Sequence, residues 1–249
     1  MPSTPDAIVL CGGAGLRLRS IISNAPKGMA DIAGRPFLEL LLRQLHRHGF
    51  QRVILAVGYQ KDVIRSHFGE EAFGLKLTYS EESRPLGTGG ALRNAADHVE
   101  TDSVLVMNGD SYTATDLAQL TSDFRESRAD GSMLVVSADG RCDCGHVMVD
   151  PTHRVIGFEE KQLSSTTHYT NAGIYLLNRK LLYEIPCEIE ISLERQLFPS
   201  WLREGKHIRA FISSGSCIDI GTPDRYCNAQ EILAKVEVEA EDQQGAGQI

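Results

Sequence analysis

A glycine-rich segment that follows the first apolar run of the chain has the composition of a phosphate-binding turn. Its sequence is Leu-Cys-Gly-Gly-Ala-Gly-Leu-Arg-Leu, and its candidate ligand-binding residues are Leu10, Gly12, Gly13 and Gly15. Glycine lets the backbone come close to a ligand and aim several N–H groups at phosphate oxygens. The spacing is neither that of a P-loop nor that of the dinucleotide fingerprint. A strand-to-helix turn without a ligand is the alternative interpretation.

Two basic residues close to this segment could neutralise phosphate charge. Arg17 lies two positions beyond Gly15, and Lys27 follows Pro26 further along the chain. A local cluster of cations can bind an anion even on a protein of net negative charge. The alternative is that both side chains are solvated at the surface.

Two aspartates lie where predicted strands end. Asp110 closely follows the apolar run 103–107, and Asp219 lies in the sequence Cys-Ile-Asp-Ile-Gly. Ligands of open α/β sheets bind at the carboxyl ends of the strands. Because Mg²⁺ is commonly held by one or two carboxylates together with phosphate oxygens, both residues are candidate magnesium ligands. The alternative is that each aspartate caps a turn.

A second glycine-rich segment, 81–92, carries carboxylates suited to a nucleotide base. Ionised glutamate only accepts hydrogen bonds, and guanine presents two adjacent donors, whereas uracil presents one donor beside acceptors. Glu82 is the predicted base contact, with Pro85, Gly87 and Thr88 beside it. Spacing alone does not separate Glu82 from its neighbour Glu81, and a flexible charged loop is the alternative.

Predicted strands and helices alternate along the first part of the chain, which indicates a mostly parallel sheet covered by helices on both faces. After Arg141 the pattern becomes rich in strands, which predicts a second region built onto the same sheet. We expect a single domain over residues 1–236, with parts at about 6–140 and 141–226, and a disordered tail at 237–249. The predicted elements are strands at 7–10, 52–57, 75–79, 103–107, 132–137, 146–149, 154–159, 172–177 and 207–212, and helices at 37–48, 60–68, 89–99, 116–128, 193–203 and 223–236.

The composition excludes several classes of protein. The chain has 249 residues, 42% of them hydrophobic, and a formal net charge of −8, which fits one folded domain and disfavours binding to nucleic acid. No apolar run approaches the roughly 18 residues of a membrane span, and residues 1–6 lack the pattern of a signal peptide. We therefore expect a cytoplasmic protein with reduced cysteines. Zinc at Cys142 and Cys144 is disfavoured, because the sequence contains no second spaced pair.

The motifs occur in an order that resembles the sugar-1-phosphate nucleotidylyltransferases, over residues 7 to about 226. They are Gly-Gly-Ala-Gly-Leu-Arg-Leu, Pro26-Lys27, Leu86-Gly-Thr-Gly-Gly, Asn108-Gly-Asp, Phe158-Glu-Glu-Lys, Asn171-Ala-Gly-Ile-Tyr and Ile218-Asp-Ile-Gly-Thr-Pro. Within the family, the chain is most similar to the D-glycero-α-D-manno-heptose 1-phosphate guanylyltransferases. Mannose-1-phosphate guanylyltransferases and N-acetylmuramate-1-phosphate uridylyltransferases share much of the set. The resemblance implies a Rossmann-like mixed sheet of the glycosyltransferase-A type, sandwiched by helices, with a strand-rich sugar-binding region.

The resemblance also implies a reaction: a sugar 1-phosphate and a nucleoside triphosphate, here GTP, give a nucleotide sugar and pyrophosphate for surface polysaccharide biosynthesis. Catalysis then depends on positioning and charge neutralisation by Arg17, Lys27 and Asp110. Asp110 and Asp219 would hold Mg²⁺. Family members are often homo-oligomers.

For the sugar phosphate, the resemblance implies contacts from the strand-rich region. The implied residues are Gly145, Glu160, Lys161, Asn171, Gly173 and, as a weaker candidate, Glu194. The sequence departs from the family pattern at Cys144, where an aromatic residue is common, and this puts one wall of the sugar pocket in doubt. Two other classes stay as alternatives: a catalytically silent nucleotide-sugar-binding subunit, and a dinucleotide-dependent oxidoreductase, whose glycine spacing is not matched.

Overall fold

The computed structural model describes residues 4–18, 21, 25–138, 145–160 and 169–246. For Leu16, Glu159, Glu160 and residues 236–246 it describes the backbone only. Within the described chain, no helix combines the length and the apolar character needed to cross a membrane.

Four parallel strands form the centre of the molecule, in the order β7-β1-β4-β6. They are β1 (Asp6–Leu10), β4 (Arg52–Val57), β6 (Leu75–Glu81) and β7 (Ser103–Asn108). Apart from the half-buried Leu10, the apolar residues along β1, β4 and β7 are buried, as expected for parallel strands that are covered on both faces. The predicted strands are confirmed to within one or two residues.

The strand-rich region continues this sheet through antiparallel pairing of β12 (Tyr169–Asn178) with β7. β12 also pairs with β9 (Gly131–Ser137) and β10 (Gly145–Val149). Beyond these lie β11 (Val155–Glu160), β13 (Ile208–Ile212) and, at the other edge, β5 (Glu71–Ala72). The expected mixed α/β fold with one added strand-rich region is therefore confirmed.

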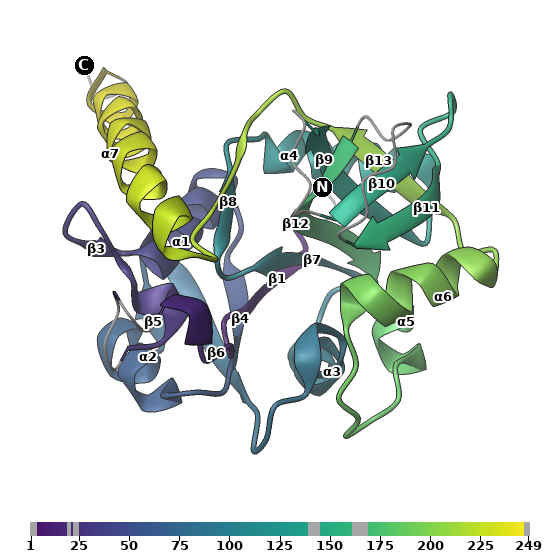
Figure 1. Cartoon of the computed structure of the whole chain (residues 1–249), viewed down its shortest axis with the longest axis horizontal. Coiled ribbons are helices and arrows are strands. Elements are labelled where there is room, and N and C mark those ends of the chain that lie inside the picture. The colour runs from purple at the N-terminus through teal and green to yellow at the C-terminus, as the bar shows by residue number, and fades with distance from the viewer. Residues whose placement is uncertain (1–3, 19–20, 22–24, 139–144, 161–168, 247–249) are drawn as a thin grey trace.

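Helices cover both faces of the sheet (Figure 1). On one face, apolar side chains of α1 (Phe37–Arg47), α2 (Lys61–Phe68), α4 (Leu117–Ser127) and α7 (Pro223–Ala246) share one core cluster. On the other face, α3 (Gly87–Ala95), α5 (Arg179–Glu184) and α6 (Phe198–Arg203) build a second cluster. In α1, the buried leucines at 38, 41, 42 and 45 follow the helical period.

Two short antiparallel pairs were not expected from the sequence. β8 (Ser111–Thr113) pairs with β14 (Cys217–Asp219), and β2 (Asp31–Ile32) pairs with β3 (Arg35–Pro36). Strands of two or three residues are too short to show an alternating pattern. The first pair joins segments far apart in the sequence, so only the tertiary fold creates it.

Two predicted helices differ from the structure. The helix expected over 193–203 begins with a π-helical turn at Leu193–Leu197 and continues as α6. The last helix does not end near Val236: α7 runs to Ala246, through most of the segment 237–249 that we expected to be disordered. The segment is rich in Glu, Ala and Gln, which have high helix propensity, so the backbone can continue the helix there. In Figure 1 the C-terminal part of α7 extends away from the sheet.

Candidate active site

The candidate residues meet at the carboxyl ends of the central strands. Leu10, at the end of β1, lies beside Ala56 of β4 and Asn108 of β7. Beyond these ends, the Gly109 N–H donates to the Leu10 carbonyl oxygen at 2.9 Å. The loops after three parallel strands therefore share one edge of the sheet, which is where ligands bind in this class of fold.

Two cavities of about 700 Å³ each open at this edge. We call them the β1-side cavity and the β12-side cavity, after the strand that each adjoins. Lys27, Asn108 and Asp110 line both cavities and so form their boundary. The predicted nucleotide-binding residues that line the β1-side cavity are Leu10, Gly12, Gly13, Glu82, Pro85, Gly87 and Thr88. A ligand spanning both cavities would pass the boundary residues.

Glu82 and Glu81 have different surroundings, which separates the two candidates. Glu82 lines the β1-side cavity, and its Oε2 accepts a hydrogen bond from the Leu86 N–H at 3.1 Å. Burial raises the pKa of Glu82 above its ordinary value. Glu81 instead forms ion pairs with Lys61 and with Arg65, the latter at 2.8 Å. The Glu81 carboxylate is therefore paired with cations outside the cavity. Of these two residues, Glu82 is the one that a ligand in the cavity would meet.

The first glycine segment is shaped by close neighbours on one side and by open space on the other. A Cβ atom at position 12 would lie 3.2 Å from a carboxylate oxygen of Glu82, whereas a Cβ at position 13 would meet nothing within 4 Å. Gly15 has φ +57° and lies against Lys27 instead of in the cavity wall. Gly12 thus makes room for Glu82, and Gly13 faces open space in the wall of the β1-side cavity.

Lys27 and Asp110 form an ion pair at the boundary of the two cavities. Lys27 lies in a 3₁₀ turn, Lys27–Met29, and its side chain is 14% exposed, whereas that of Asp110 is 38% exposed. The hydroxyl of Ser111 donates to the other oxygen of Asp110 at 3.2 Å. An anion in either cavity would therefore meet Lys27 beside a partly accessible carboxylate.

The unexpected β8–β14 pair brings Asp219 next to Asp110. Asp219 lies opposite Ser111 in the register, and the Ile220 N–H donates to the Asp110 carbonyl oxygen at 3.0 Å. The Arg225 guanidinium donates to both carboxylate oxygens of Asp219 at 3.0 Å. The two predicted metal ligands are thus neighbours, and each of them is paired with a cation.

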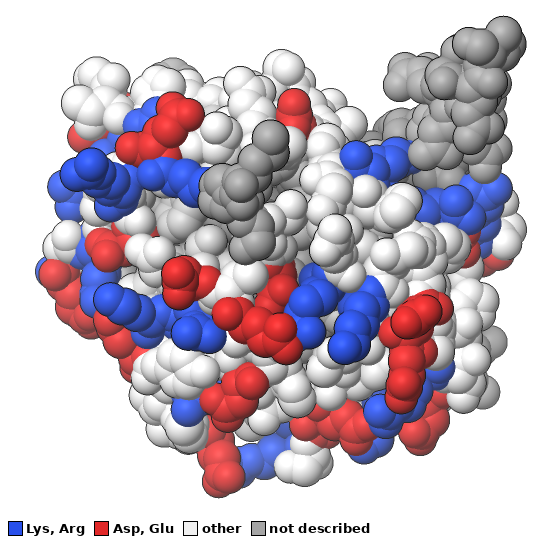
Figure 2. Space-filling model, turned by 180° about the vertical axis from the view of Figure 1, so that it is seen from behind, with Lys and Arg blue, Asp and Glu red and all other residues white. Residues whose placement is uncertain are grey.

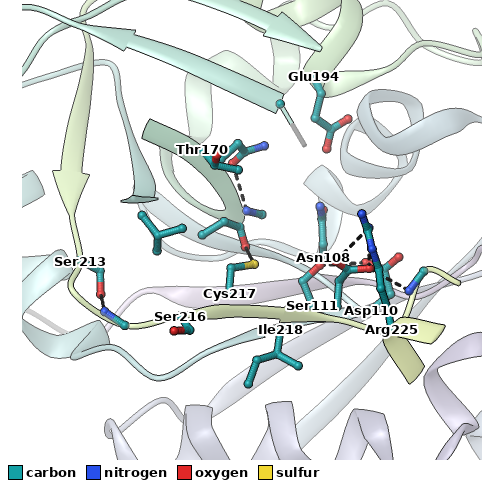
Figure 3. Close-up of a pocket in the computed structure, with 18 of the residues that line it drawn as sticks. Asn108, Asp110, Ser111, Thr170, Glu194, Ser213, Ser216, Cys217, Ile218 and Arg225 are labelled. Carbon is teal, nitrogen blue, oxygen red and sulfur yellow. Dashed lines mark hydrogen bonds and ion pairs between the residues drawn. The ribbon is translucent and has the colours of Figure 1, made fainter. Parts of the chain in front are cut away.

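The β12-side cavity collects the described residues that were expected to bind the sugar phosphate. Gly145, Asn171, Gly173 and Glu194 line it. Figure 3 shows Glu194 on the opposite side of this cavity from Ser216 and Ile218. The exposed Arg17 also lines the β12-side cavity and not the β1-side cavity. The side chain of Glu160 and the whole of Lys161 lie outside the described residues.

Cys11, inside the first glycine-rich motif, is not a candidate nucleophile. Its side chain is buried, and its thiol donates to the Ala56 carbonyl oxygen at 3.3 Å. Burial raises the pKa of Cys11 to about 12. The thiol therefore stays protonated at neutral pH, and a thiolate is the reactive form.

Some lining residues were missed by the sequence reasoning. Arg225 follows Asp219 by six positions at the start of α7, and its charge beside the aspartate motif was the available signal. Asn108 belongs to the Asn-Gly-Asp motif, but the sequence predicted no contact for it. Its buried Oδ1 accepts no hydrogen bond from the described residues, so it is available to a ligand. Glu190 lines the β1-side cavity from a segment without any motif, so only the fold could identify it.

Charged side chains of both signs are mixed on one face of the molecule (Figure 2). The formal net charge is −8, and on the face shown in Figure 2 acidic and basic side chains are interspersed. The electrostatic footprint of a nucleic-acid-binding protein is instead a basic patch or stripe.

Comparisons with known proteins identify relatives of this chain among guanylyltransferases. A mannose-1-phosphate guanylyltransferase from Mycobacterium tuberculosis is 38% identical over 232 residues, which cover 92% of this chain and 65% of that protein. This chain thus spans slightly less than two thirds of that relative. A D-glycero-alpha-D-manno-heptose 1-phosphate guanylyltransferase from Campylobacter jejuni is 38% identical over 221 residues, covering 89% of this chain and 96% of that protein.

Solved structures show the same fold. HddC from Yersinia pseudotuberculosis superposes with a TM-score of 0.82 at 32% identity, covering 92% of this chain and 100% of that one. HddC complexed with GMP-PN superposes with a TM-score of 0.81. The nucleotidyl transferase family model matches residues 6–236. The family resemblance found in the motifs is confirmed, and this chain belongs to the nucleotidyl transferase family.

Proposed function

We propose that this protein is a sugar-1-phosphate guanylyltransferase that transfers GMP from GTP to D-glycero-α-D-manno-heptose 1-phosphate. The observation that carries the choice of guanine is the Glu82 carboxylate in the wall of the β1-side cavity. Its two oxygens can accept from the two adjacent donors of guanine. The names of the relatives from Mycobacterium tuberculosis and Campylobacter jejuni support the same nucleotide.

Heptose 1-phosphate is preferred to mannose 1-phosphate because the motifs resemble those of the heptose enzymes most. Two relatives named for heptose 1-phosphate, from Campylobacter jejuni and Aneurinibacillus thermoaerophilus, are 38% and 34% identical to this chain. The mannose enzyme from Mycobacterium tuberculosis has the same 38% identity as the first of them. Mannose 1-phosphate is the second candidate, supported by that equal identity. The sugar nucleotide formed would serve the synthesis of a surface polysaccharide.

The proposed reaction is a direct displacement at the α-phosphorus of GTP. A phosphate oxygen of the sugar phosphate forms the new bond to this phosphorus, and the bond to the bridging oxygen breaks as pyrophosphate leaves. The attacking group is already an anion, so a general base is not required. Lys27, which lines both cavities, would neutralise the phosphates that react, and the exposed Arg17 would neutralise charge beside them.

The charge balance at the boundary fits a magnesium ion. Lys27 with Asp110 and Arg225 with Asp219 are two ion pairs, so these four groups carry no net formal charge. Phosphate groups entering there would add negative charge that these pairs do not offset. Asp110 and Asp219 would hold Mg²⁺ together with phosphate oxygens, and the ion would supply charge stabilisation for the reacting phosphate. Among the described residues no three acidic, cysteine or histidine side chains are grouped for a metal, so the proposed ion would need substrate oxygens as further ligands.

The test is pyrophosphate release with Mg²⁺, with GTP, ATP, UTP and CTP each combined with heptose 1-phosphate, mannose 1-phosphate and N-acetylmuramate 1-phosphate. We expect the highest kcat/KM for GTP with the heptose. Faster turnover with GTP and mannose 1-phosphate would support GTP as the nucleotide substrate but replace heptose 1-phosphate by mannose 1-phosphate as the sugar substrate. Preference for UTP would overturn the role of Glu82. Folded protein that binds GTP and a sugar phosphate but releases no pyrophosphate would favour a silent binding subunit.

A further inference from the structure

The second glycine-rich segment makes room for another part of the same chain. Ile191 lies in segment 188–192, which precedes the π-helical turn Leu193–Leu197. Its N–H donates to the Leu86 carbonyl oxygen at 2.9 Å, and its own carbonyl oxygen accepts from the Gly89 N–H at 2.9 Å. Gly87 has φ +69°, and a Cβ atom there would lie 2.6 Å from the Ile191 carbonyl oxygen. Segment 188–192 is therefore fixed on the start of α3.

Thr88, in the same glycine-rich segment, connects this packing to the β12-side cavity. Its hydroxyl accepts a hydrogen bond from the Leu193 N–H at 2.8 Å and donates to Oε2 of Glu194 at 2.6 Å. The hydroxyl of Ser192 donates to the same oxygen at 3.1 Å. One side of the Glu194 carboxylate is thus held by two hydroxyls, one of them from the segment that lines the β1-side cavity.

Tyr175 holds the other side of this carboxylate from β12. Asn171 donates its side-chain N–H to the Tyr175 phenol oxygen at 2.7 Å, which leaves the phenol proton for Oε1 of Glu194 at 3.4 Å. Burial raises the pKa of Tyr175 well above its ordinary value, and the Glu194 charge adds to the rise. The phenol therefore stays a donor, and its ring packs against Phe198 with centroids 4.9 Å apart.

We propose that Thr88 and Tyr175 are positioning residues that fix the Glu194 carboxylate for a sugar hydroxyl in the β12-side cavity. The inference rests on the proposed function, because it assigns the sugar-phosphate subsite of the same reaction. A carboxylate held from two sides keeps one orientation, so a sugar hydroxyl that donates to it does not have to order it first. Single π-helical turns are frequent at functional sites, and here such a turn carries Glu194.

The experiment measures kcat and both KM values by pyrophosphate release, with GTP and whichever sugar 1-phosphate the wild type turns over faster. Thr88→Val removes the bridging hydroxyl, and Tyr175→Phe removes the phenol hydroxyl but keeps the ring. For each variant we expect the KM for the sugar phosphate to rise about tenfold, which corresponds to ~1.4 kcal/mol. The KM for GTP should change much less. Thr88→Ser should restore the wild-type value, because it retains the hydroxyl.

Two matched control variants lose a hydroxyl elsewhere in the fold. Thr121→Val removes a hydroxyl that donates to the Leu117 carbonyl oxygen within α4. Tyr79→Phe removes a phenol hydroxyl that donates to the Gly69 carbonyl oxygen. Neither residue lines a cavity at the site. Both controls should keep the wild-type KM for the sugar phosphate, whatever they do to the melting temperature. Equal KM changes in controls and variants would overturn the inference.

A double mutant separates positioning from general damage. If Thr88 acts through Glu194, Thr88→Val should add little to the rise in KM that Glu194→Gln already causes. Full additivity would overturn the inference, as would equal changes in kcat and in both KM values. Failure of the proposed function looks different: the wild type itself would then neither turn over nor bind any of the sugar phosphates by calorimetry, and both conclusions would fall together.

Discussion

The two glycine-rich segments of this protein have similar compositions but different reasons for their glycines. At Gly13 an added Cβ atom would meet nothing within 4 Å, whereas at Gly90 it would lie 2.6 Å from the Ile189 carbonyl oxygen. Gly13 of the first segment faces open space, whereas Gly87 and Gly90 of the second segment make room for segment 188–192 of the same chain. Clustered glycines therefore indicate a close approach of something, and only the neighbours identify it.

The two cavities also differ in the parts of the chain that line them. Both glycine-rich segments line the described wall of the β1-side cavity, together with Glu82 and Glu190, whereas residues of β12, β14 and α7 line the β12-side cavity. They share Lys27 and Asp110, whose ion pair stands between them. Residues that line one cavity should therefore affect one substrate, and the shared residues should affect every substrate pair. Thr88 is the exception, because it lines the β1-side cavity but its hydroxyl holds Glu194 of the β12-side cavity.

The largest effect is expected at the shared boundary. Asp110→Asn should lower kcat at least about 100-fold for all nucleotide and sugar combinations, because the charge that positions Lys27 and a metal ion is lost. The control is Asp62→Asn, at an exposed position of α2. Pyrophosphate release measures the rates, and thermal unfolding checks the fold. A folded Asp110→Asn variant with near-normal rates would contradict the assignment of Asp110 to the reaction.

The contrast between the glycine segments is tested by a matched pair of alanine variants. Gly90→Ala should lower the free energy of unfolding by about 1–3 kcal/mol, because the new methyl group meets backbone. Gly13→Ala should change it by less than ~0.5 kcal/mol, but should raise the KM for GTP, since its methyl group enters the β1-side cavity. Denaturant unfolding gives the stabilities. Equal losses of stability in the two variants would contradict the inference that Gly90 packs against backbone and Gly13 faces open space.

The next effect is confined to the β1-side cavity. Glu82→Gln should lower the ratio of kcat/KM for GTP to that for UTP by about tenfold, because glutamine offers one acceptor and one donor side by side. The KM for the sugar phosphate should stay unchanged. The control Glu81→Gln alters a carboxylate that is paired with Lys61 and Arg65 outside the cavity. A similar change of nucleotide ranking in both variants would move the base contact elsewhere.

The smallest effect concerns stability and pH. Burial raises the pKa of Glu82, so its ionised form costs stability, and this cost disappears as the pH falls through the folded-state pKa. Glu82→Gln removes the cost and keeps an acceptor for the Leu86 N–H. The variant should therefore melt slightly above the wild type at pH 7–8, with the difference vanishing below about pH 4. Thermal unfolding across this range measures it, and a lower melting temperature at pH 8 would contradict it.

Much of the fold was predictable from local patterns. The runs that form β1, β4 and β7 are apolar because they are buried on both faces, and the leucines of α1 repeat with the helical period. Motifs and residue chemistry also identified Asp110, Asn171 and Glu82 as site candidates, and the structure places all three in cavity walls. Apolar runs in buried strands and helical repeats of apolar residues are expected in any sequence whose strands and helices pack in layers.

The remaining features depend on contacts between distant segments. The choice between Glu81 and Glu82 follows from the cations of α2, and Arg225 was found only through its ion pair with Asp219. Segment 188–192 has no motif of its own, and its position on α3 could not be read from the chain. Helix length was also misjudged in α7, because helix propensity outweighed the polar composition that had suggested disorder.

The sequence by itself determined the order of strands and helices, the family and the residue types available for phosphate, base and metal. It did so because periodicity and motif spacing are properties of consecutive residues. Only the tertiary structure decided which carboxylates are free, which glycines face a cavity and which hydroxyls hold Glu194. Those properties depend on neighbours such as Thr88 and Glu194, which are 106 positions apart in the chain and 2.6 Å apart in the fold.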